Sequence, residues 1–186
     1  MGKIVALSYM SLDGVAQDPH EWTMEYFTPE HQKFAHGQLF ASDALLLGRV
    51  TYEGFAAAWP HMEEQTGEYG VRMNTLPKYV VSTTLEKAEW NNSTIIRENV
   101  KDELVAVKER HEKDILVFGS VDLVDSLIEY GVLDELKLWV HPVVVGKGQK
   151  MFRDGAPLSK WTLASTSVMA SSGTVVLDYR PAAAGA

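Results

Sequence analysis

Two apolar segments that each end in a glycine constrain the fold of this chain more than any other feature. Residues 44–47 lead into Gly48-Arg49-Val50-Thr51, and residues 115–118 lead into Gly119-Ser120. A short, continuous apolar segment is typical of a strand buried on both faces, as in parallel α/β sheets. Residues able to begin a helix follow each glycine. Because a helix N-terminus presents free N–H groups and about half a positive charge, the two junctions indicate a site for a phosphate-containing ligand.

The composition limits the class of protein. The chain has 186 residues, 46% of them hydrophobic, which is enough for a single domain over residues 1–180 with a real core. We expect residues 181–186 to form a disordered tail. The net charge is −8 and the 17 Lys and Arg residues are scattered, which argues against a nucleic-acid partner or an anionic membrane surface.

Other functions are excluded by what the sequence lacks. No segment approaches the roughly 20 apolar residues of a membrane span. The chain has no cysteine, which excludes disulfides and thiolate chemistry and favours a cytoplasmic location. The six histidines show no H-E-x-x-H or comparable spacing, so we expect no metal site.

Strand and helix patterns alternate along the first two thirds of the chain. Strands are expected at residues 4–8, 44–47, 78–81, 93–96, 115–118 and 136–140, and helices at 29–41, 52–58, 100–107 and 121–130. Thr51 is expected to cap the second helix, and residues 61–70 to form a polar surface excursion. Residues 161–169 and 174–179 have the pattern of an antiparallel hairpin. The count is about eight strands and four helices in an α/β fold.

Six short segments in this order resemble the reductase domain at the C-terminus of bacterial riboflavin-biosynthesis deaminase-reductases, which has the dihydrofolate-reductase-like fold. The segments are residues 11–14, 46–53, 78–82, 117–120, 131–136 and 141–148. The resemblance covers residues 3–180. It implies a three-layer αβα architecture around a mixed, mostly parallel sheet that ends in an antiparallel hairpin. It also implies a homodimer, with which exposed apolar residues near 143–145 are compatible.

The resemblance further implies NADPH as the cofactor, bound across the C-terminal ends of the strands. The residues that carry over are Gly48, Arg49 and Thr51 at the phosphates, Ser82 and Thr83 near the adenosine and its 2′-phosphate, and Gly119, Ser120, Val121, Asp122 and Leu123 around the pyrophosphate and nicotinamide ribose. An arginine with bidentate donors and a helix dipole suit such an anion. The alternatives are a surface salt bridge for Arg49, a plain strand end for Ser82 and Thr83, and a packing role for Gly119.

Fewer residues point to the substrate, because hydride transfer depends mainly on positioning. Glu30 lies near the place where dihydrofolate reductases carry their active-site carboxylate, or else it complements its helix dipole. Asp13 contacts substrate or nicotinamide, or it shapes its own turn. Trp22 is either a wall of the substrate pocket or core, and Lys147 either meets an anionic substrate group or belongs to a plain loop.

These features favour an NADPH-dependent reductase acting on a small heterocyclic, imine-bearing or aldehyde-level substrate. The activity that the resemblance implies is 5-amino-6-(5-phosphoribosylamino)uracil reductase of riboflavin biosynthesis. Two residues depart from that family: Phe118 stands where an acidic residue is usual, and Ser120 replaces the second glycine. The alternative is an NADP-binding module that has lost turnover and acts as a sensor or scaffold.

Overall fold

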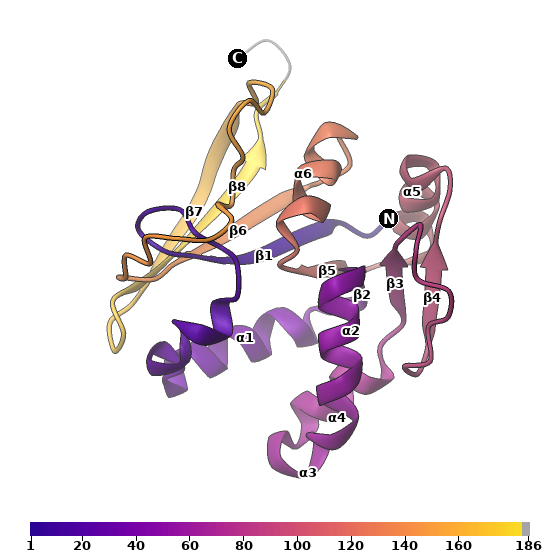
Figure 1. Ribbon diagram of the computed structural model, residues 1–186, viewed down its shortest axis with the longest axis horizontal. Coiled ribbons are helices and arrows are strands. Elements are labelled where there is room, and N and C mark those ends of the chain that lie inside the picture. Colours follow the sequence, from indigo (N-terminus) through magenta and orange to yellow (C-terminus); the bar gives the residue numbers. More distant parts are fainter. Residues whose placement is uncertain (184–186) are drawn as a thin grey trace.

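Eight strands form one sheet in the computed structural model, which describes residues 1–183 (Figure 1). Their order is β4-β3-β2-β5-β1-β6-β8-β7. The first six in this order are parallel to one another, β8 is antiparallel to β6, and β7 is antiparallel to β8. The bounds are β1 (Ile4–Met10), β2 (Ser42–Gly48), β3 (Lys78–Val81), β4 (Ser93–Ile96), β5 (Asp114–Phe118), β6 (Glu135–Val140), β7 (Trp161–Met169) and β8 (Thr174–Pro181). The predicted mixed sheet with its terminal hairpin is confirmed.

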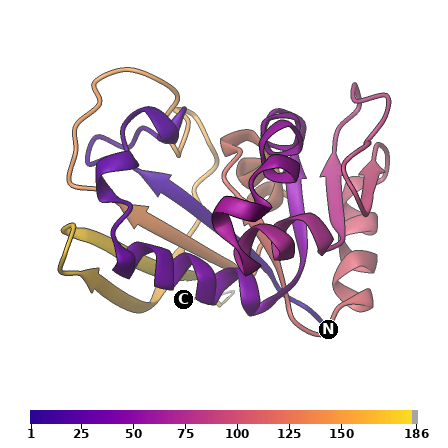
Figure 2. The ribbon, with the colours of Figure 1, turned by 90° about the horizontal axis from the view of Figure 1, so that it is seen from below.

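Helices cover both faces of the sheet and complete the predicted three layers (Figures 1 and 2). The α-helices are α1 (Pro29–Phe40), α2 (Arg49–Ala58), α3 (Glu63–Thr66), α4 (Glu68–Thr75), α5 (Val100–Arg110) and α6 (Val121–Glu129). Three short 3-10 turns are η1 (Pro19–Glu21), η2 (Met24–Tyr26) and η3 (Trp59–His61). Within residues 1–183, no helix is long and apolar enough to cross a membrane.

Double burial explains the apolar segment that ends at Gly48. Successive residues of a strand point to opposite faces, and both faces of β2 are covered. Leu46 packs in the core under α5 and α6, whereas Leu45 and Leu47 pack in the core under α1, α2 and α4. All three side chains are fully buried. The uninterrupted run of leucines therefore marks a central strand, and the glycine that follows lies at its carboxyl end.

Two predictions about the helices were wrong. Helix α2 begins at Arg49 with Gly48 as its N-cap, so Thr51 lies inside the first turn instead of capping it. The expected count of about four helices was also too low: the polar stretch at residues 61–70 does lie mostly at the surface, but α3 and α4 occupy most of it. Both helices are short and mostly polar, and α4 buries only one large apolar side chain, Met73, so their low apolar content did not mark them as helices that face the core.

The C-terminal strand runs further than expected. Pro181 still belongs to β8 and pairs with Trp161, and the Ala182 N–H donates to the Lys160 carbonyl over 3.0 Å. The predicted tail therefore does not begin at residue 181, and its last residues, 184–186, lie outside the described part of the chain. Val144 is 68% exposed, as a dimer contact there would require, and the homodimer itself stays a prediction.

A single buried hydroxyl joins α2 to the loop between β3 and β4. The Tyr52 hydroxyl accepts a hydrogen bond from the Trp90 backbone N–H over 3.0 Å, and Tyr52 is 3% exposed. We predict that Tyr52→Phe lowers the free energy of unfolding by about 1–3 kcal/mol, because the buried N–H loses its acceptor. The control is Tyr130→Phe, whose side chain is at the surface. Equal unfolding free energies for the two variants, measured by urea denaturation, would contradict this account.

Candidate active site

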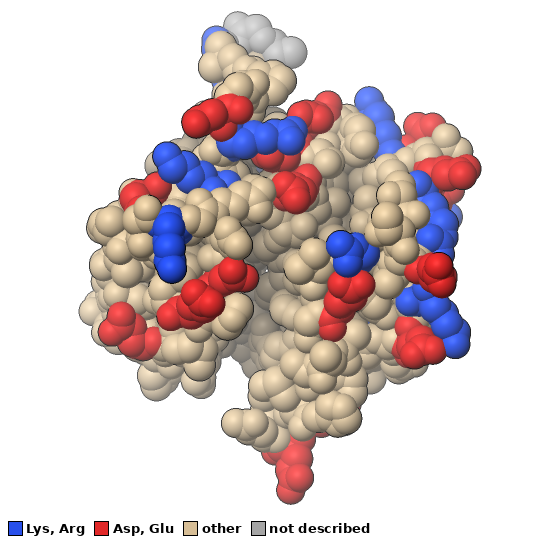
Figure 3. All heavy atoms as spheres, viewed as in Figure 1, with Lys and Arg blue, Asp and Glu red and all other residues tan. Residues whose placement is uncertain are grey.

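Three strand exits lie next to one another at the carboxyl edge of the sheet. Strands β3, β2 and β5 are consecutive, with Gly48 opposite Val81 and Leu46 opposite Val117. Parallel strands end at the same edge, so Ser82, the start of α2 and the start of α6 are neighbours. Figure 3 shows the surface hollowed beside this region, between the lobe that contains α2 and the lobe that contains β1 and β6–β8. The convergence expected from the two glycine junctions is confirmed.

The glycine at the end of β2 is required by a close approach of two chain segments. A Cβ added to Gly48 would lie 2.5 Å from the Ser120 Oγ and 3.1 Å from the Ser120 Cβ. The φ angle of Gly48 is −78°, which any residue can adopt, so the constraint is space and not backbone conformation. The two junctions are thus in van der Waals contact, and the first turns of α2 and α6 begin side by side.

The α6 junction exposes backbone donors. Gly119 and Ser120 both have left-handed φ angles, 49° and 56°, and the Ser120 side chain makes no capping hydrogen bond. The first helical hydrogen bond runs from the Val124 N–H to the Ser120 carbonyl, so the N–H groups of residues 121–123 precede it. The side chains of Val121 and Leu123 are buried, which leaves their backbone N–H groups as the parts that can reach a ligand.

In the structure Arg49 forms a surface salt bridge, which was the alternative to phosphate binding. Its guanidinium donates to Glu53 one turn further along α2 over 2.9 Å, and its side chain is 44% exposed. Such a surface pair contributes little to stability, so it does not oppose a stronger anionic partner. A second arginine, Arg97, follows β4 at the same edge of the sheet and donates to the Glu86 carbonyl. The sequence analysis did not single out Arg97.

Ser82 has a structural task as well as a position near the site. Its hydroxyl accepts hydrogen bonds from the backbone N–H groups of Thr84 and Leu85, over 3.2 and 2.9 Å, and so it shapes the turn after β3. Thr83 is exposed at the same turn. The strand-end alternative therefore describes Ser82 in this structure, while Thr83 is the hydroxyl open to solvent.

Ser8 is a candidate that sequence reasoning missed. It follows Leu7, whose carbonyl accepts from the Gly119 N–H over 3.0 Å, and by strand alternation its side chain lies on the α6 face of β1. Ser8 is 2% exposed, and within residues 1–183 its hydroxyl has no hydrogen-bond partner. A buried hydroxyl without a partner beside the α6 junction fits a polar group of a bound ligand. No sequence signal separates it from an ordinary strand serine.

Asp13 ties two loops together. Its carboxylate accepts from the Ser11 hydroxyl over 2.6 Å and from the Val145 and Gly146 N–H groups over 3.0 and 2.7 Å. These hydrogen bonds, that of Ser11 first, lower the pKa of Asp13 to about 2. Figure 2 shows the loop after β6 beside the loop after β1. Lys147 lies exposed on the loop that Asp13 holds.

The same pair of loops reaches the α6 junction through Gln149, another residue that the sequence analysis missed. Its side-chain amide donates to the Asp122 carboxylate over 2.8 Å, and its backbone N–H donates to the Gln17 side chain over the same distance. Asp122 is therefore engaged with a neighbouring loop through its side chain. Its backbone N–H is the part that can serve a ligand.

Glu30 lies apart from the Gly48–Ser120 contact. Its carboxylate accepts from the backbone N–H and the hydroxyl of Ser171, over 3.2 and 2.8 Å, at the turn between β7 and β8. The structure therefore places this carboxylate at the hairpin. Trp22 donates from its indole nitrogen to the Gln17 carbonyl, and its ring meets the edge of His141 with centroids 5.7 Å apart.

Phe118, at the position where riboflavin-pathway reductases are usually acidic, packs against the ring of Phe55 in α2, with centroids 5.7 Å apart. The surface formed by Phe118 and Phe55 is therefore apolar. A separate open groove of about 930 Å³ lies between α2 and residues 85–91, lined in part by Tyr52, Leu85 and Trp90. Its lining carries three carboxylates, Glu53, Glu63 and Glu89, against one lysine, Lys87, so it is less suited to phosphate than the Gly48–Ser120 corner.

Comparison with solved structures defines the class of fold. A candidate riboflavin biosynthesis protein from Shewanella sp. PV-4 superimposes with a TM-score of 0.76 at 16% identity, over 97% of this chain and 99% of that one. Dihydrofolate reductase from Enterococcus faecalis, solved with NADP(H), gives a TM-score of 0.62 at 16% identity, over 97% of both chains. The fold is dihydrofolate-reductase-like.

Sequence comparison then gives the family. The RibD C-terminal domain family matches residues 2–176, and this chain belongs to it. YyaP, an uncharacterised protein of Bacillus subtilis strain 168, is 30% identical over 139 residues, which are 74% of this chain and 73% of YyaP. The family resemblance recognised in the sequence is confirmed.

The close approach of Gly48 to Ser120 gives a direct prediction. Gly48→Ala forces a methyl group against Ser120 and should cost about 1–3 kcal/mol of unfolding free energy, because the two helix starts must separate. The matched control is Gly54→Ala in the same helix, where an added Cβ meets nothing within 4 Å. It should gain about 0.5–1 kcal/mol. A stabilised Gly48→Ala variant, measured by thermal unfolding, would contradict the close approach.

Stability should also depend on pH through His31. Burial, with a smaller contribution from His141, lowers the pKa of His31 to about 4. The unfolded histidine, with a pKa of about 6.5, binds more protons than the folded one between pH 4 and 6.5. We predict that the unfolding free energy falls as pH drops through this window, by about 3 kcal/mol from this residue. His31→Gln should flatten the profile, and an unchanged slope would show that the acid sensitivity arises elsewhere.

Proposed function

We propose that this protein is an NADPH-dependent reductase that delivers hydride to a small heterocyclic, imine-bearing or aldehyde-level substrate. The observation that carries the proposal is the contact between Gly48 and Ser120. It brings two helix N-termini together beside an arginine, in a cradle that one methyl group would fill. Two converging dipoles and free N–H groups favour a ligand with more than one phosphate.

The strand order supports one path for an extended dinucleotide. Neighbouring strands are about 4.8 Å apart, so the exits of β3, β2, β5 and β1 span roughly 14 Å along the edge. At one end, Thr83, Arg97 and the side chain of Arg49 suit the 2′-phosphate. The helix starts at Gly48 and Ser120 suit the pyrophosphate in the middle. At the other end, the Ser8 hydroxyl is available to the nicotinamide half.

When bound, NADPH supplies the hydride, and the residues of this chain position the reactants and exclude water. Phe118 and Phe55 provide a dry surface beside the α6 junction. Asp13 is ionised at neutral pH and occupied by backbone donors, so we assign it to holding the loop and not to donating a proton. Glu30 is assigned to fixing the β7–β8 turn because the backbone N–H and the hydroxyl of Ser171 donate to its carboxylate.

Membership of the RibD C-terminal domain family supports the reductase step of riboflavin biosynthesis as one candidate activity. The Phe118–Phe55 contact replaces the usual acidic residue with an apolar surface. This favours a substrate that presents a different group at that point from the riboflavin-pathway pyrimidine. The replacement of the acidic residue by Phe118 does not change the proposed class of reaction, because hydride transfer depends on the residues that hold the cofactor and not on that acidic side chain.

The test combines binding and turnover. NADPH and NADH are titrated against the tryptophan fluorescence, and NADPH oxidation is followed with a panel of heterocyclic, imine and aldehyde substrates. We expect binding of NADPH and oxidation with at least one substrate. Binding without turnover over the whole panel would instead support the sensor or scaffold module. Failure to bind either nucleotide would contradict both.

Arg49 gives a sharper prediction. Arg49→Ala should weaken the binding of NADPH about 10- to 100-fold, because a charge-assisted hydrogen bond to the 2′-phosphate is lost. It should weaken the binding of NADH much less, because NADH lacks that phosphate. Glu53→Ala breaks the same ion pair but keeps the guanidinium, so it should leave NADPH affinity unchanged or raise it. Calorimetric titration measures both. Equal weakening of NADPH and NADH would place Arg49 at the pyrophosphate, and no weakening would remove it from the site.

A further inference from the structure

The groove between α2 and residues 85–91 is not used by the proposed dinucleotide path. Its volume of about 930 Å³ is within the range of sites that hold small organic molecules. The α2 residues that line it begin at Tyr52 and continue to Ala57, whereas the phosphate donors are at the first turn of that helix. The groove is therefore a separate place on the same helix, and its lining defines what it can bind.

The floor of the groove is a network of buried side chains, formed by Tyr52, Asn74 and Trp90. The Trp90 indole N–H donates to the Asn74 side-chain carbonyl over 2.7 Å, and the Trp90 backbone N–H donates to the Tyr52 hydroxyl over 3.0 Å. The two aromatic rings lie with their centroids 6.1 Å apart. The groove thus has an aromatic floor that hydrogen bonds hold in place before any ligand binds.

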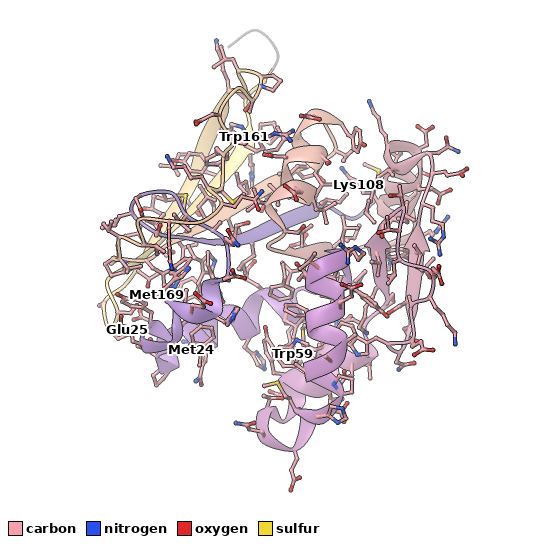
Figure 4. All side chains as sticks on the ribbon, in the orientation of Figure 1. Met24, Glu25, Trp59, Lys108, Trp161 and Met169 are labelled. Atoms are coloured by element: carbon pink, nitrogen blue, oxygen red, sulfur yellow. The ribbon has the colours of Figure 1, made fainter. Side chains whose placement is uncertain are left out.

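The same network fixes a carboxylate at the groove. The Asn74 side-chain amide donates to the Glu63 carboxylate over 2.7 Å and to the Trp59 carbonyl over 3.0 Å. Figure 4 shows Trp59 at the C-terminal end of α2. Because a neutral amide holds the Glu63 carboxylate, this hydrogen bond orients the negative charge without cancelling it.

Carboxylates from three different elements line the groove. Glu53 is in α2, Glu63 begins α3, and Glu89 is in the segment between β3 and β4. Lys87 belongs to the lining as well and pairs with Glu89 over 2.7 Å. Three carboxylates against this one ammonium leave the lining negative above an aromatic floor. Carboxylates and aromatic rings both attract cations, so the groove suits a flat apolar molecule with a cationic group.

A second lysine is close to the floor but does not neutralise these carboxylates. The Lys78 Nζ lies 4.2 Å from the centroid of the Trp90 ring, and the side chain is fully buried. Its ammonium donates to three backbone carbonyls over distances of 2.8 to 3.0 Å. These bonds use all three of its N–H groups, so Lys78 is satisfied by the backbone and leaves the acidic side chains of the groove to a ligand.

Glu53 connects the groove to the nucleotide site. It lines the groove, and its carboxylate also accepts from the Arg49 guanidinium over 2.9 Å. A cation bound in the groove competes with Arg49 for this carboxylate and so frees the guanidinium for a phosphate. Because coupling between two sites is reciprocal, a phosphate bound at Arg49 strengthens the binding of the cation by the same factor.

We propose that the groove between α2 and residues 85–91 is a second ligand site, which binds an organic cation with a flat apolar body, and that this ligand raises the affinity for NADPH through Glu53. Tyr52 and Trp90 contact the apolar body, and Glu63 and Glu89 hold the cationic group. The site itself stands on the groove alone. The coupling rests on the proposed function, since it requires NADPH at Arg49.

Indole NMR on the intact protein tests the site without NADPH. The probes are benzamidine, which is a flat aromatic cation, and benzamide, which has nearly the same shape without the charge. We expect a saturable shift of the Trp90 indole N–H signal with millimolar benzamidine, as suits a ligand of this size, and none with benzamide. No shift with benzamidine, or an equal shift with benzamide, would overturn the site.

A matched pair of variants locates the bound cation. Glu63→Gln removes a charge from the lining but keeps an oxygen that accepts from Asn74, so the affinity for benzamidine should fall about two- to fivefold. Glu64→Gln removes the same charge from the next residue, which is exposed and outside the lining, and should leave the affinity unchanged. An equal loss in both variants would reduce the effect to general attraction by an acidic surface and contradict the site.

NADPH titrations test the coupling. Saturating benzamidine should tighten the binding of NADPH about two- to fivefold, which is the strength of a surface ion pair, and should have no effect in Glu53→Gln, where Arg49 is already free. An NADPH affinity that benzamidine leaves unchanged in the unsubstituted protein would contradict the coupling. Indole shifts with benzamidine in a protein that binds no NADPH would support the groove as a ligand site and remove the reductase.

Discussion

The close approach of Gly48 to Ser120 is the constraint on which the rest of the site depends. It requires a residue without a side chain at the end of β2, and it places the first turns of α2 and α6 together. It also requires that β2 and β5 be neighbours in the sheet, which the register of Leu46 with Val117 provides. The dipoles, the free N–H groups and the position of Arg49 all follow from this one contact.

Much of this geometry could be predicted from the sequence because it is encoded locally. The leucines at 45–47 indicate a strand buried on both faces, and the glycine that follows indicates its exit. Thr28 before Pro29 correctly indicates the start of α1, where the Thr28 hydroxyl accepts from the His31 N–H. The terminal hairpin was equally plain from its two strand patterns. These features need only neighbouring residues to be recognised.

One buried cluster of rings could not be predicted, because its members come from β1, α1 and the end of β6; they are Tyr9, His31, Trp139 and His141. His31 is a polar residue in the first turn of a helix, and His141 precedes a proline, so each has an ordinary local explanation. Their meeting depends on β1 and β6 being neighbours, with Tyr9 opposite Trp139. Helix α4 was missed for a different reason, since packing of Met73 and Gly70 stabilises it in place of an apolar stripe.

The Gly48–Ser120 corner combines two helix N-termini with the exposed guanidinium of Arg49, which is the character that a phosphate-containing ligand requires. The most direct test of the central claim is a backbone amide NMR titration of the whole chain with NADPH. The account predicts that amides of residues 49–51 and 120–123 shift together with one saturation curve. Shifts confined to the groove between α2 and residues 85–91, with both helix starts unaffected, would contradict it.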